Sequence, residues 1–239
     1  MTLLPEAIEY HIAHLPTVTL MSIITFLILG ICSWIAKRYW QMVPQGLQNL
    51  VEWALGFIYD FADEIIGPTA AAYYPLLVGL FLFIFTGNIL GLIPGFISPT
   101  ANLNTTVALA LIVFFYYHYQ GVKTQGWHYF KHFAGPVWWL APLMIPIEII
   151  SHLARPLSLA FRLFGNILAK EIILTILAML ISIFLLSSGF LQKSLALLPL
   201  ILRPAIIILG TLVSLIQAGV FLILTTIYIA GAVRMENGH

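Results

Sequence analysis

The sequence predicts an all-α polytopic membrane protein, with five spanning segments and one interfacial amphipathic helix. Three observations support this fold class. The 239 residues are 61% hydrophobic, with a mean hydropathy of +1.02. Only 10 Lys and Arg and 9 Asp and Glu are present, too few to cover the surface of a soluble domain of this size. Several apolar runs reach about 20 residues, enough to cross a bilayer as a helix, so residues 1–239 are expected to form a single membrane domain.

Charge and cysteine content exclude several other classes. A net charge of +1 offers no basic surface for nucleic acid. Cys32 is the single cysteine and lies in an apolar run, so the chain has no disulfide framework. Glu6 and Glu9 precede the first apolar run in place of a basic segment, so no cleavable signal peptide is expected.

Residues 17–36 are the first predicted spanning helix. The run ends at Lys37 and Arg38, whereas the segment before it contains neither Lys nor Arg. Because basic residues gather on the cytoplasmic side of membrane proteins, the N-terminus is expected outside and Lys37 and Arg38 inside.

Residues 44–66 are too polar to span a bilayer, since acidic residues alternate with large apolar ones. The acidic residues are Glu52, Asp60, Asp63 and Glu64. This pattern favours an amphipathic helix along the cytoplasmic interface. A linker helix in solution is the alternative.

Residues 74–93 and 103–119 form a predicted spanning hairpin, joined by a Gly- and Pro-containing turn without charge. Aromatic residues gather at the end of the second segment, as in an interfacial belt. The following loop contains Lys123 and Lys131, so it is again expected to be cytoplasmic. With five crossings, the C-terminus is expected in the cytoplasm.

Residues 138–186 and 195–233 are predicted to form two long antiparallel helices. A helix of about 50 residues would be about 75 Å long, against a hydrocarbon thickness of about 30 Å. Each must therefore be strongly tilted or bent, and the prolines of the first can kink it. In the second, Arg203, Gly210 and Gln217 recur every seven residues and share one face.

The stretch from Glu148 to Glu171 concentrates polar residues within an otherwise apolar sequence. At about 100° per residue, a group of them lies within about 40° of Arg162 on one helix face. The group comprises Glu148, Ser151, Arg155, Ser158 and Asn166. Glu171 lies on the opposite face and about 13 Å further along. Glu171 and Arg162 therefore cannot pair on one straight helix and must serve different surroundings.

Arg162 is the sharpest functional candidate. Placing a charged side chain at bilayer depth raises the free energy of insertion by at least about 2.5–3.5 kcal/mol. Such a residue is therefore expected only where it has a partner or lines a polar path. Arginine stays protonated; it can therefore block other cations or attract a carboxylate, whereas Glu148 and Glu171 can exchange protons. For Arg155 and Lys170, extension toward the interfaces is an equally good interpretation.

Three motifs carry a resemblance to a known family: HLARPLSLAFRLFGNILAKE, LIQAGVFLILTTIYI and LNTTVALAL. Together they resemble subunit a of the Fo sector of F-type ATP synthases, over about residues 88–228. The resemblance implies a stator subunit without catalytic activity of its own, beside a rotating c-ring of small hairpin subunits that each carry a membrane carboxylate. The other implied partners are the peripheral stalk subunit b, the remaining ATP synthase subunits and the lipid bilayer.

The resemblance also implies a role for each site residue. Arg162 corresponds to the arginine that separates two offset aqueous half-channels and attracts the ring carboxylate. Glu171 corresponds to the relay acid of the outer half-channel, with Asn166 nearby. Glu148 and Ser158 correspond to polar positions of the cytoplasmic half-channel, and Gln217 faces the arginine from the last helix.

One departure from the family concerns Gly210, where some members carry a histidine or glutamate that works with the relay acid. Lys170 or water could replace the missing side chain, and the sequence does not decide between them. Asn88 and Asn102 suit either an outer entry funnel or helix caps. The coupling ion, proton or sodium, and the number of ring subunits are set by other chains; a proton is expected.

Two rival functions remain at this stage. A membrane di-metal enzyme of the desaturase type would use histidine clusters, for which the pairs are His128 with His132, His11 with His14, and His152 with Glu148. A secondary ion transporter would work without a ring. Neither is preferred, and no cofactor or metal is expected. The predicted location is the cell inner membrane of a bacterium, as a multi-pass protein; an organelle inner membrane is the alternative.

Overall fold

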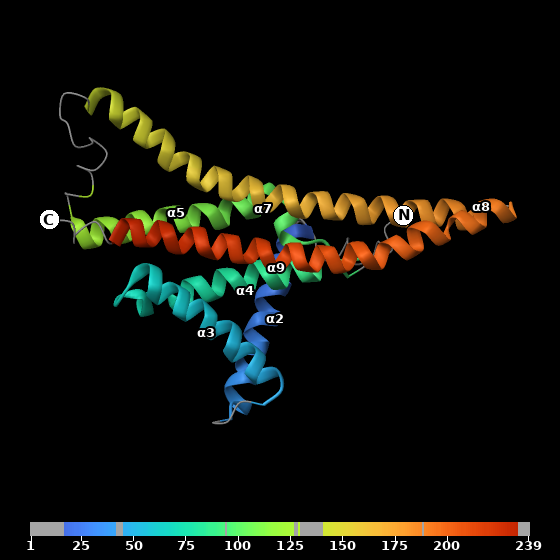
Figure 1. The fold of residues 1–239 in the computed structure, drawn as a ribbon, viewed down its shortest axis with the longest axis horizontal. Helices are drawn as coiled ribbons and strands as arrows, with labels where there is room; N and C mark the ends of the chain where they lie inside the picture. Colours follow the sequence, from blue (N-terminus) through green and yellow to red (C-terminus); the bar gives the residue numbers. More distant parts are fainter. Residues whose placement is uncertain are drawn as a thin grey trace.

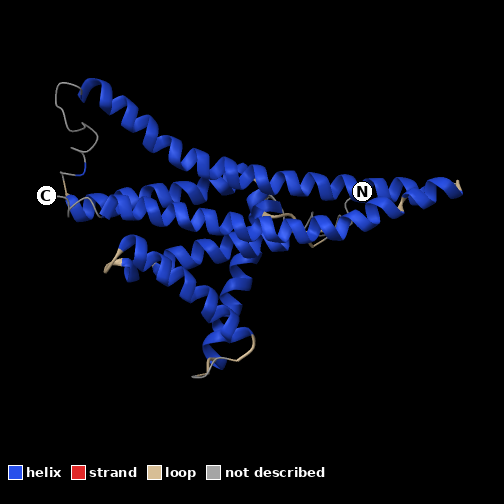
Figure 2. Ribbon diagram, in the orientation of Figure 1, coloured by secondary structure: helices blue, strands red, loops and turns tan. Residues whose placement is uncertain are grey.

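The computed structural model describes residues 17–41, 45–93, 95–126, 129, 141–187 and 189–233, and these are helical apart from short turns (Figure 2). The α-helices are α2 (Thr17–Tyr39), α3 (Leu47–Ile66), α4 (Tyr74–Leu90), α5 (Leu103–Gln125), α7 (Ala141–Leu186), α8 (Phe190–Leu195) and α9 (Leu197–Val233). Two 3-10 turns, η1 (Ala70–Ala72) and η2 (Pro99–Ala101), precede α4 and α5. The predicted all-α fold class is confirmed.

Three segments are long and apolar enough to cross a membrane, and α4 is a shorter apolar helix. The three are Thr17–Tyr39, Pro142–Leu186 and Lys193–Val233. They match the first, fourth and fifth predicted spanning segments. The crossings assigned to α4 and α5 stay predictions, and α5 continues six residues beyond its expected end at 119.

The four helices α4, α5, α7 and α9 run along the long direction of the molecule, whereas α2 runs across it (Figure 1). At about 1.5 Å per residue, the 46 residues of α7 and the 37 of α9 extend about 69 and 56 Å. If α2 crosses the membrane along the membrane normal, α7 and α9 must be strongly inclined to that normal, as expected from their length. Pro146 and Pro156 lie inside α7, and because proline has no amide hydrogen to donate within a helix, they explain the bend of that helix in Figure 1.

Helix α9 is the centre of the bundle and packs against α3, α4, α5 and α7. Helices α4 and α5 follow each other in the chain, as expected for a hairpin. In space, however, α9 lies between them (Figure 1). Helix α4 makes its main contacts with α9, whereas α5 packs mainly on α7 and also on α9. The core is thus made by side chains from all four helices, among them Leu77, Val113, Leu163 and Phe221, each almost completely buried.

Hydroxyl side chains are buried in α9 without disturbing this apolar core. Ser214, Thr225 and Thr226 each donate a hydrogen bond to the carbonyl four residues earlier, over 2.7–2.9 Å. A hydroxyl satisfied by its own helix needs no external partner. The core is consequently apolar between helices, and polar contacts between helices are concentrated in a few clusters.

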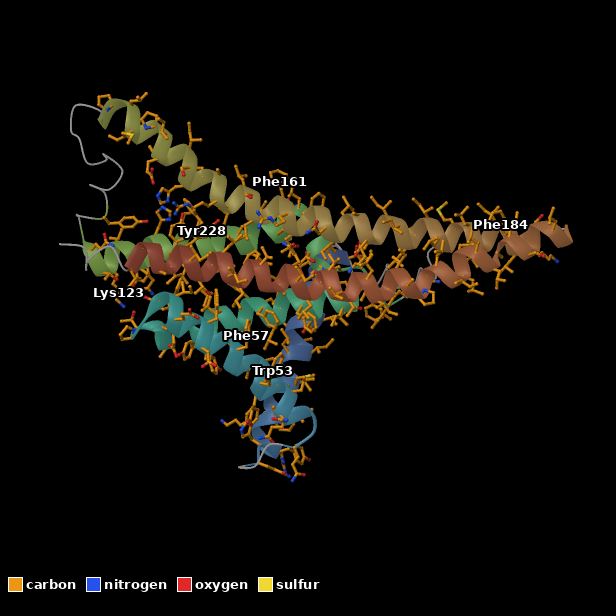
Figure 3. The ribbon with its side chains drawn as sticks, in the orientation of Figure 1. Trp53, Phe57, Lys123, Phe161, Phe184 and Tyr228 are labelled. Carbon is orange, nitrogen blue, oxygen red and sulfur yellow. The ribbon has the colours of Figure 1, made fainter. Side chains whose placement is uncertain are left out.

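Helix α3 is amphipathic, as expected. Ile58, Ala62 and Ile66 are buried against the bundle, where α3 packs on α4 and α9. Trp53 and Phe57 are 71% and 61% exposed and line an open apolar pocket between α3, α4 and α9 (Figure 3). Exposed aromatic residues on a packed helix are typical of an interfacial position, so this placement stays our prediction and the free linker is disfavoured.

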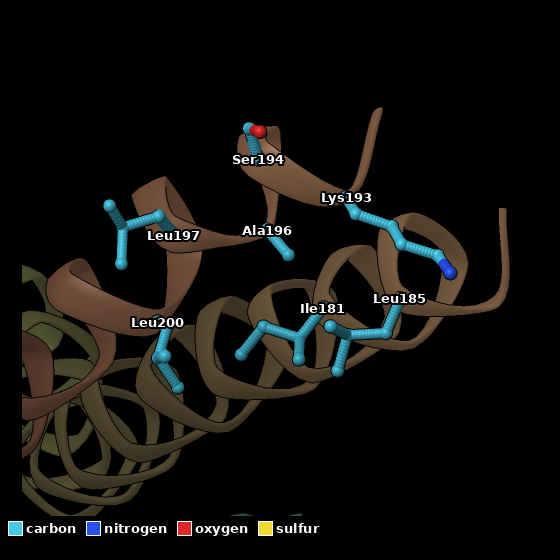
Figure 4. Close-up of a pocket in the computed structure, with 7 residues that line it drawn as sticks. All are labelled: Ile181, Leu185, Lys193, Ser194, Ala196, Leu197 and Leu200. Carbon is cyan, nitrogen blue, oxygen red and sulfur yellow. The ribbon is translucent and has the colours of Figure 1, made fainter. Parts of the chain in front are cut away.

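The second half of α7, the short α8 and the first half of α9 project beyond the other helices (Figure 1). Here α7 and α9 have mostly each other as partners, and they enclose a largely apolar pocket next to α8 (Figure 4). Its lining residues are Ile181, Leu185, Lys193, Ser194, Ala196, Leu197 and Leu200. Large apolar side chains such as Ile183 and Ile208 are 60% and 69% exposed.

Several expectations fall on residues outside the described ranges. They concern the acidic N-terminal residues Glu6 and Glu9, the histidines His11, His14, His128 and His132, the basic Lys131, and the starts of the predicted segments 44–66 and 138–186.

Candidate functional site

The predicted polar stripe of α7 is present, and its central members face outward. Ser158, Arg162 and Asn166 are exposed in the isolated chain. Arg162 lies near the middle of α7, at the level of Phe161 in Figure 3, and no acidic side chain of the described ranges forms an ion pair with it. Ser158 and Asn166 lie one turn on either side of it, and large apolar residues such as Phe161, 55% exposed, flank this polar stripe. Arg162 is therefore a permanent cation on an apolar outer surface, available to a carboxylate from another chain.

One helical turn further along, α7 and α9 are joined by a polar contact. The Asn166 side-chain amide donates to Oε1 of Gln217 over 2.8 Å. Gln217 is 3% exposed, and its own amide nitrogen makes no hydrogen bond to any described residue. A buried donor left unpaired costs about 1–3 kcal/mol. Gln217 thus combines a structural contact with a free hydrogen-bond donor on the side of α9 that faces α7.

Glu171 lies in a second polar cluster, on the opposite side of α7 from Arg162 as predicted. Its Oε1 accepts a hydrogen bond of 2.8 Å from the backbone amide of Ser98, just before η2. The Ser98 hydroxyl donates to Oδ1 of Asn88 over 3.2 Å, and the Thr100 hydroxyl donates to the same oxygen. Gly91 permits this arrangement, because a Cβ there would lie 2.7 Å from that of Ser98.

Lys170 belongs to the same cluster and does not extend toward an interface. It is 6% exposed, and its Nζ donates to the backbone carbonyl of Asn88 over 3.0 Å. Asn88 lies in the last turn of α4, where carbonyls have no partner within the helix. The carbonyls of Gly87, Ile89 and Leu90 accept bonds from the following turn. Lys170 therefore caps the C-terminus of α4 through the remaining carbonyl, a favourable position for a cation.

The stem of Lys170 fills the space beside Gly210. A Cβ built on Gly210 would lie 2.8 Å from Cδ and 3.2 Å from Cγ of Lys170. The lysine side chain thus occupies the space beside the glycine, and whether Lys170 or water takes over the function of the missing side chain stays open. Asn88 thus belongs to the polar cluster, whereas Asn102 caps α5 by accepting from the amide of Asn104 over 2.8 Å.

A third polar cluster surrounds the start of the stripe, where α7 packs on α5. Glu148 Oε1 lies 3.3 Å from Nε2 of His152, and Nδ1 of His152 lies 3.2 Å from the Tyr117 hydroxyl. The guanidinium of Arg155 stacks over the ring of Tyr228, 5.4 Å from its centroid. The sequence pattern attributed Tyr117 to an interfacial belt and missed this contact, which depends on the pairing of α5 with α7.

The three clusters show how α7 changes partner along its length. Around Glu148 it faces α5, at Asn166 it faces α9, and at Glu171 it faces η2 and the end of α4. Between the first and last clusters, its inward residues Leu159, Leu163 and Ile167 are fully buried. The two predicted proton-exchanging acids therefore lie in separate polar environments, with an apolar core between them and Arg162 outside it.

A metal centre has no support in the part of the chain that the structure describes. Within those ranges no three His, Cys, Asp or Glu side chains converge. His152 and Glu148 form a pair of their own, and the other histidine pairs of the di-metal hypothesis lie outside the described residues.

Comparison with known proteins identifies the family. A sequence model described as ATP synthase A chain matches residues 19–230. The chain is 48% identical to ATP synthase subunit a 1 of Syntrophotalea carbinolica, over 96% of this chain and 89% of that protein. It is 46% identical to ATP synthase subunit a of Geobacter sulfurreducens, over 87% and 83%, and 43% identical to that of Helicobacter hepaticus, over 91% and 90%. The match begins well before the region that carries the sequence motifs, and the chain belongs to the ATP synthase A chain family.

Proposed function

We propose that this protein is the ion-translocating stator subunit of a rotary F-type ATP synthase, with two offset half-channels that carry protons to and from the carboxylates of a c-ring. The observation that carries the proposal is the arrangement along α7. Two acids lie in separate polar clusters, and a cation without an acidic partner in the described residues lies between them on the outer surface.

Offset channels follow from the electrostatics. A continuous polar path would let protons cross without turning a rotor. Here Leu159, Leu163 and Ile167 are fully buried between the clusters of Glu148 and Glu171. One proton moving through 100 mV releases about 2.3 kcal/mol, so several must be coupled to each product. A ring with many carboxylates couples several protons to each product if every proton must be carried by a ring carboxylate from one half-channel to the other.

Each site residue has a role in this proposal. Glu148 and Ser158 belong to the cytoplasmic half-channel, and Glu171 to the outer one. Arg162 attracts the ionised ring carboxylate and repels protons, since a guanidinium stays charged. Asn166 and Gln217 hold α7 to α9 beside it through their 2.8 Å hydrogen bond.

The exposed apolar face of α7 and α9 is the surface we assign to the ring. It contains Leu157, Phe161, Ile208 and Leu212, each between 52% and 69% exposed. Peripheral stalk subunit b and the other ATP synthase subunits would contact the remaining surfaces. The protein would act in an energy-conserving membrane, expected to be a bacterial inner membrane, with its N-terminus outside and its C-terminus in the cytoplasm, and would have no catalytic activity alone.

The substitution Arg162→Ala tests the proposal in the complete complex, reconstituted in vesicles. Proton-driven ATP synthesis should fall to background, because the ring carboxylate loses its partner. Arg203→Ala is the matched control, since Arg203 is also an arginine within a long helix but lies outside the three clusters; it should assemble and retain synthesis. Near-normal synthesis in the Arg162 variant would contradict the role.

A secondary transporter is separated from this proposal by a second experiment. Cysteines placed beside Arg162 and Gln217 should crosslink to a small hairpin subunit in the complex, and the isolated chain in vesicles should not conduct protons. Conduction by the isolated chain, without any ring, would favour the transporter.

A further inference from the structure

The cluster at the start of the polar stripe contains a titratable residue to which the proposed function gives no role. His152 lies one helical turn after Glu148 on α7, with its two ring nitrogens directed at different partners. Nε2 is 3.3 Å from the Glu148 carboxylate, and Nδ1 is 3.2 Å from the Tyr117 hydroxyl. Both nitrogens of this imidazole are therefore engaged, one by an acid and the other by a phenol.

Exposure falls stepwise along these three side chains. The Glu148 side chain is 41% exposed, that of His152 is 14% exposed, and Tyr117 is 1% exposed. Glu148 thus lies at the surface, His152 behind it and Tyr117 within the bundle. A proton that enters from solvent at Glu148 meets His152 next.

Every helix packed around His152 contributes a titratable or charged neighbour. Helix α5 contributes Tyr117 and His118, and the His118 ring meets that of His152 edge-on at 5.2 Å. The remaining neighbours are Arg155 and Glu148 of α7, Tyr129 after α5, and Tyr228 of α9.

Arg155 and His152 have different closest partners. Arg155 lies over the Tyr228 ring at 5.4 Å, whereas the ion-pair contact of Glu148 within the described residues is to His152. His118 directs Nδ1 to the Phe114 carbonyl of its own helix, 2.9 Å away. The printed contact of Glu148 is therefore with a titratable imidazole, and Arg155, stacked on Tyr228, remains an electrostatic neighbour of both His152 and Tyr117.

This geometry suits proton exchange. Imidazole is the side chain whose ordinary titration lies nearest neutral pH. The contact with the Tyr117 hydroxyl orients the ring, and when Nδ1–H donates to that oxygen, Nε2 has a free lone pair. The second nitrogen can then take a proton from Glu148 or from water beside it and return it. The carboxylate and the imidazole together can hold up to two exchangeable protons, whereas a lone carboxylate holds one.

We propose that His152 is a second proton-exchanging residue at the mouth of the cytoplasmic half-channel, paired with Glu148 and oriented by Tyr117. This inference rests on the proposed function and adds a residue to it. Glu148 exchanges protons with the cytoplasm, and His152 passes each proton on from Glu148 toward the interior.

The test uses the complete ATP synthase in vesicles with the cytoplasmic face outward, where ATP hydrolysis drives proton uptake through this mouth. In His152→Gln, the amide keeps hydrogen bonding but cannot be protonated. Pumping should fall about tenfold at about pH 8.5 and change little at about pH 6, because a lone carboxylate is seldom protonated at high pH. Imidazole added outside should restore pumping in His152→Ala.

His118→Gln is the matched control, because it replaces the neighbouring imidazole, which does not contact Glu148. It should leave the pH profile unchanged. Tyr117→Phe removes the orienting hydroxyl and should give a smaller deficit of the same pH dependence; it also serves if His152 variants fail to assemble. A deficit of equal size at all pH values, without rescue by imidazole, would overturn the inference. That result with Arg162→Ala still inactive would leave the proposed function intact.

Discussion

Two cations on α7, eight residues apart, are treated in opposite ways by the fold. Lys170 is enclosed: its stem lies against Gly210, and its ammonium group is bonded to the Asn88 carbonyl. Arg162 is exposed on an apolar surface and has no acidic partner among the described residues. A charge that the chain satisfies by itself contributes to the stability of the chain. A charge that the chain leaves without an acid is expected to meet one on another subunit.

The same contrast separates the two regions around these residues. Near Lys170, helices α4, α7 and α9 and the turn η2 meet in one buried hydrogen-bonded network. Near Arg162, α7 presents Ser158 and Arg162 outward, and Asn166 makes a hydrogen bond to α9. The buried region therefore contributes to the stability of the fold and, in our proposal, to the outer half-channel, whereas we assign the exposed region to contact with the ring. Substitutions can test this division.

The largest effect is expected for Glu171→Gln. The glutamine can still accept the hydrogen bond from the Ser98 amide, which the carboxylate accepts over 2.8 Å, so the fold should be retained. It cannot exchange protons, and synthesis should fall about a hundredfold, a typical contribution of one proton-transferring group. ATP synthesis in vesicles, normalised to the amount of assembled complex, measures this. An unchanged rate would mean that the Lys170 region is purely structural.

A smaller effect, on stability rather than on rate, is expected for Gly210→Val. The new Cβ would lie 2.8 Å from Cδ of Lys170, which cannot move freely because Nζ is bonded to Asn88. Overpacking of this kind costs about 1–3 kcal/mol, and the melting temperature of the purified complex should fall.

Gly219→Val is the matched control for Gly210→Val. It lies on the same helix, and a Cβ added there would have no atom of a neighbouring element within 4 Å among the described residues, so it should melt as the parent does. When Lys170 is already alanine, Gly210→Val should lower the melting temperature less than it does in the parent, since the closest clashing atoms, Cδ and Cγ of Lys170, are absent. Equal losses in both glycine variants would show that Lys170 does not occupy the critical space.

Much of this architecture could be predicted from the sequence, because helix length and polar periodicity are local properties. The opposed faces of Arg162 and Glu171 followed from the helical repeat alone, and the structure gives them different surroundings. The length of α7 and α9 likewise required that they be inclined. Such features depend on one segment at a time and need no knowledge of how the segments pack.

The partners of these residues could not be predicted in the same way. The backbone amide of Ser98 that meets Glu171 lies 73 positions away, and a backbone donor leaves no mark in the side-chain pattern. Lys170 and Gly210 are complementary only because α7 and α9 cross there. The contact of Tyr117 with His152 could not be predicted, because Tyr117 lies in an aromatic run of the kind found at membrane interfaces. In each case the missing information was the packing of α4, α5 and α9 around α7.

The smallest effect is expected for Lys170→Met, and it sharpens the comparison most. Methionine keeps an unbranched apolar stem beside Gly210 and removes the ammonium group that caps α4. The lost cap should cost about 0.5–2 kcal/mol, visible as a modest fall in melting temperature with synthesis largely retained. Arg162→Met should show the reverse, with synthesis lost and the melting temperature unchanged, because no described acidic residue pairs with Arg162. If both variants lost synthesis equally, the two cations would share one function, and the division between a structural and a ring-facing charge would be wrong.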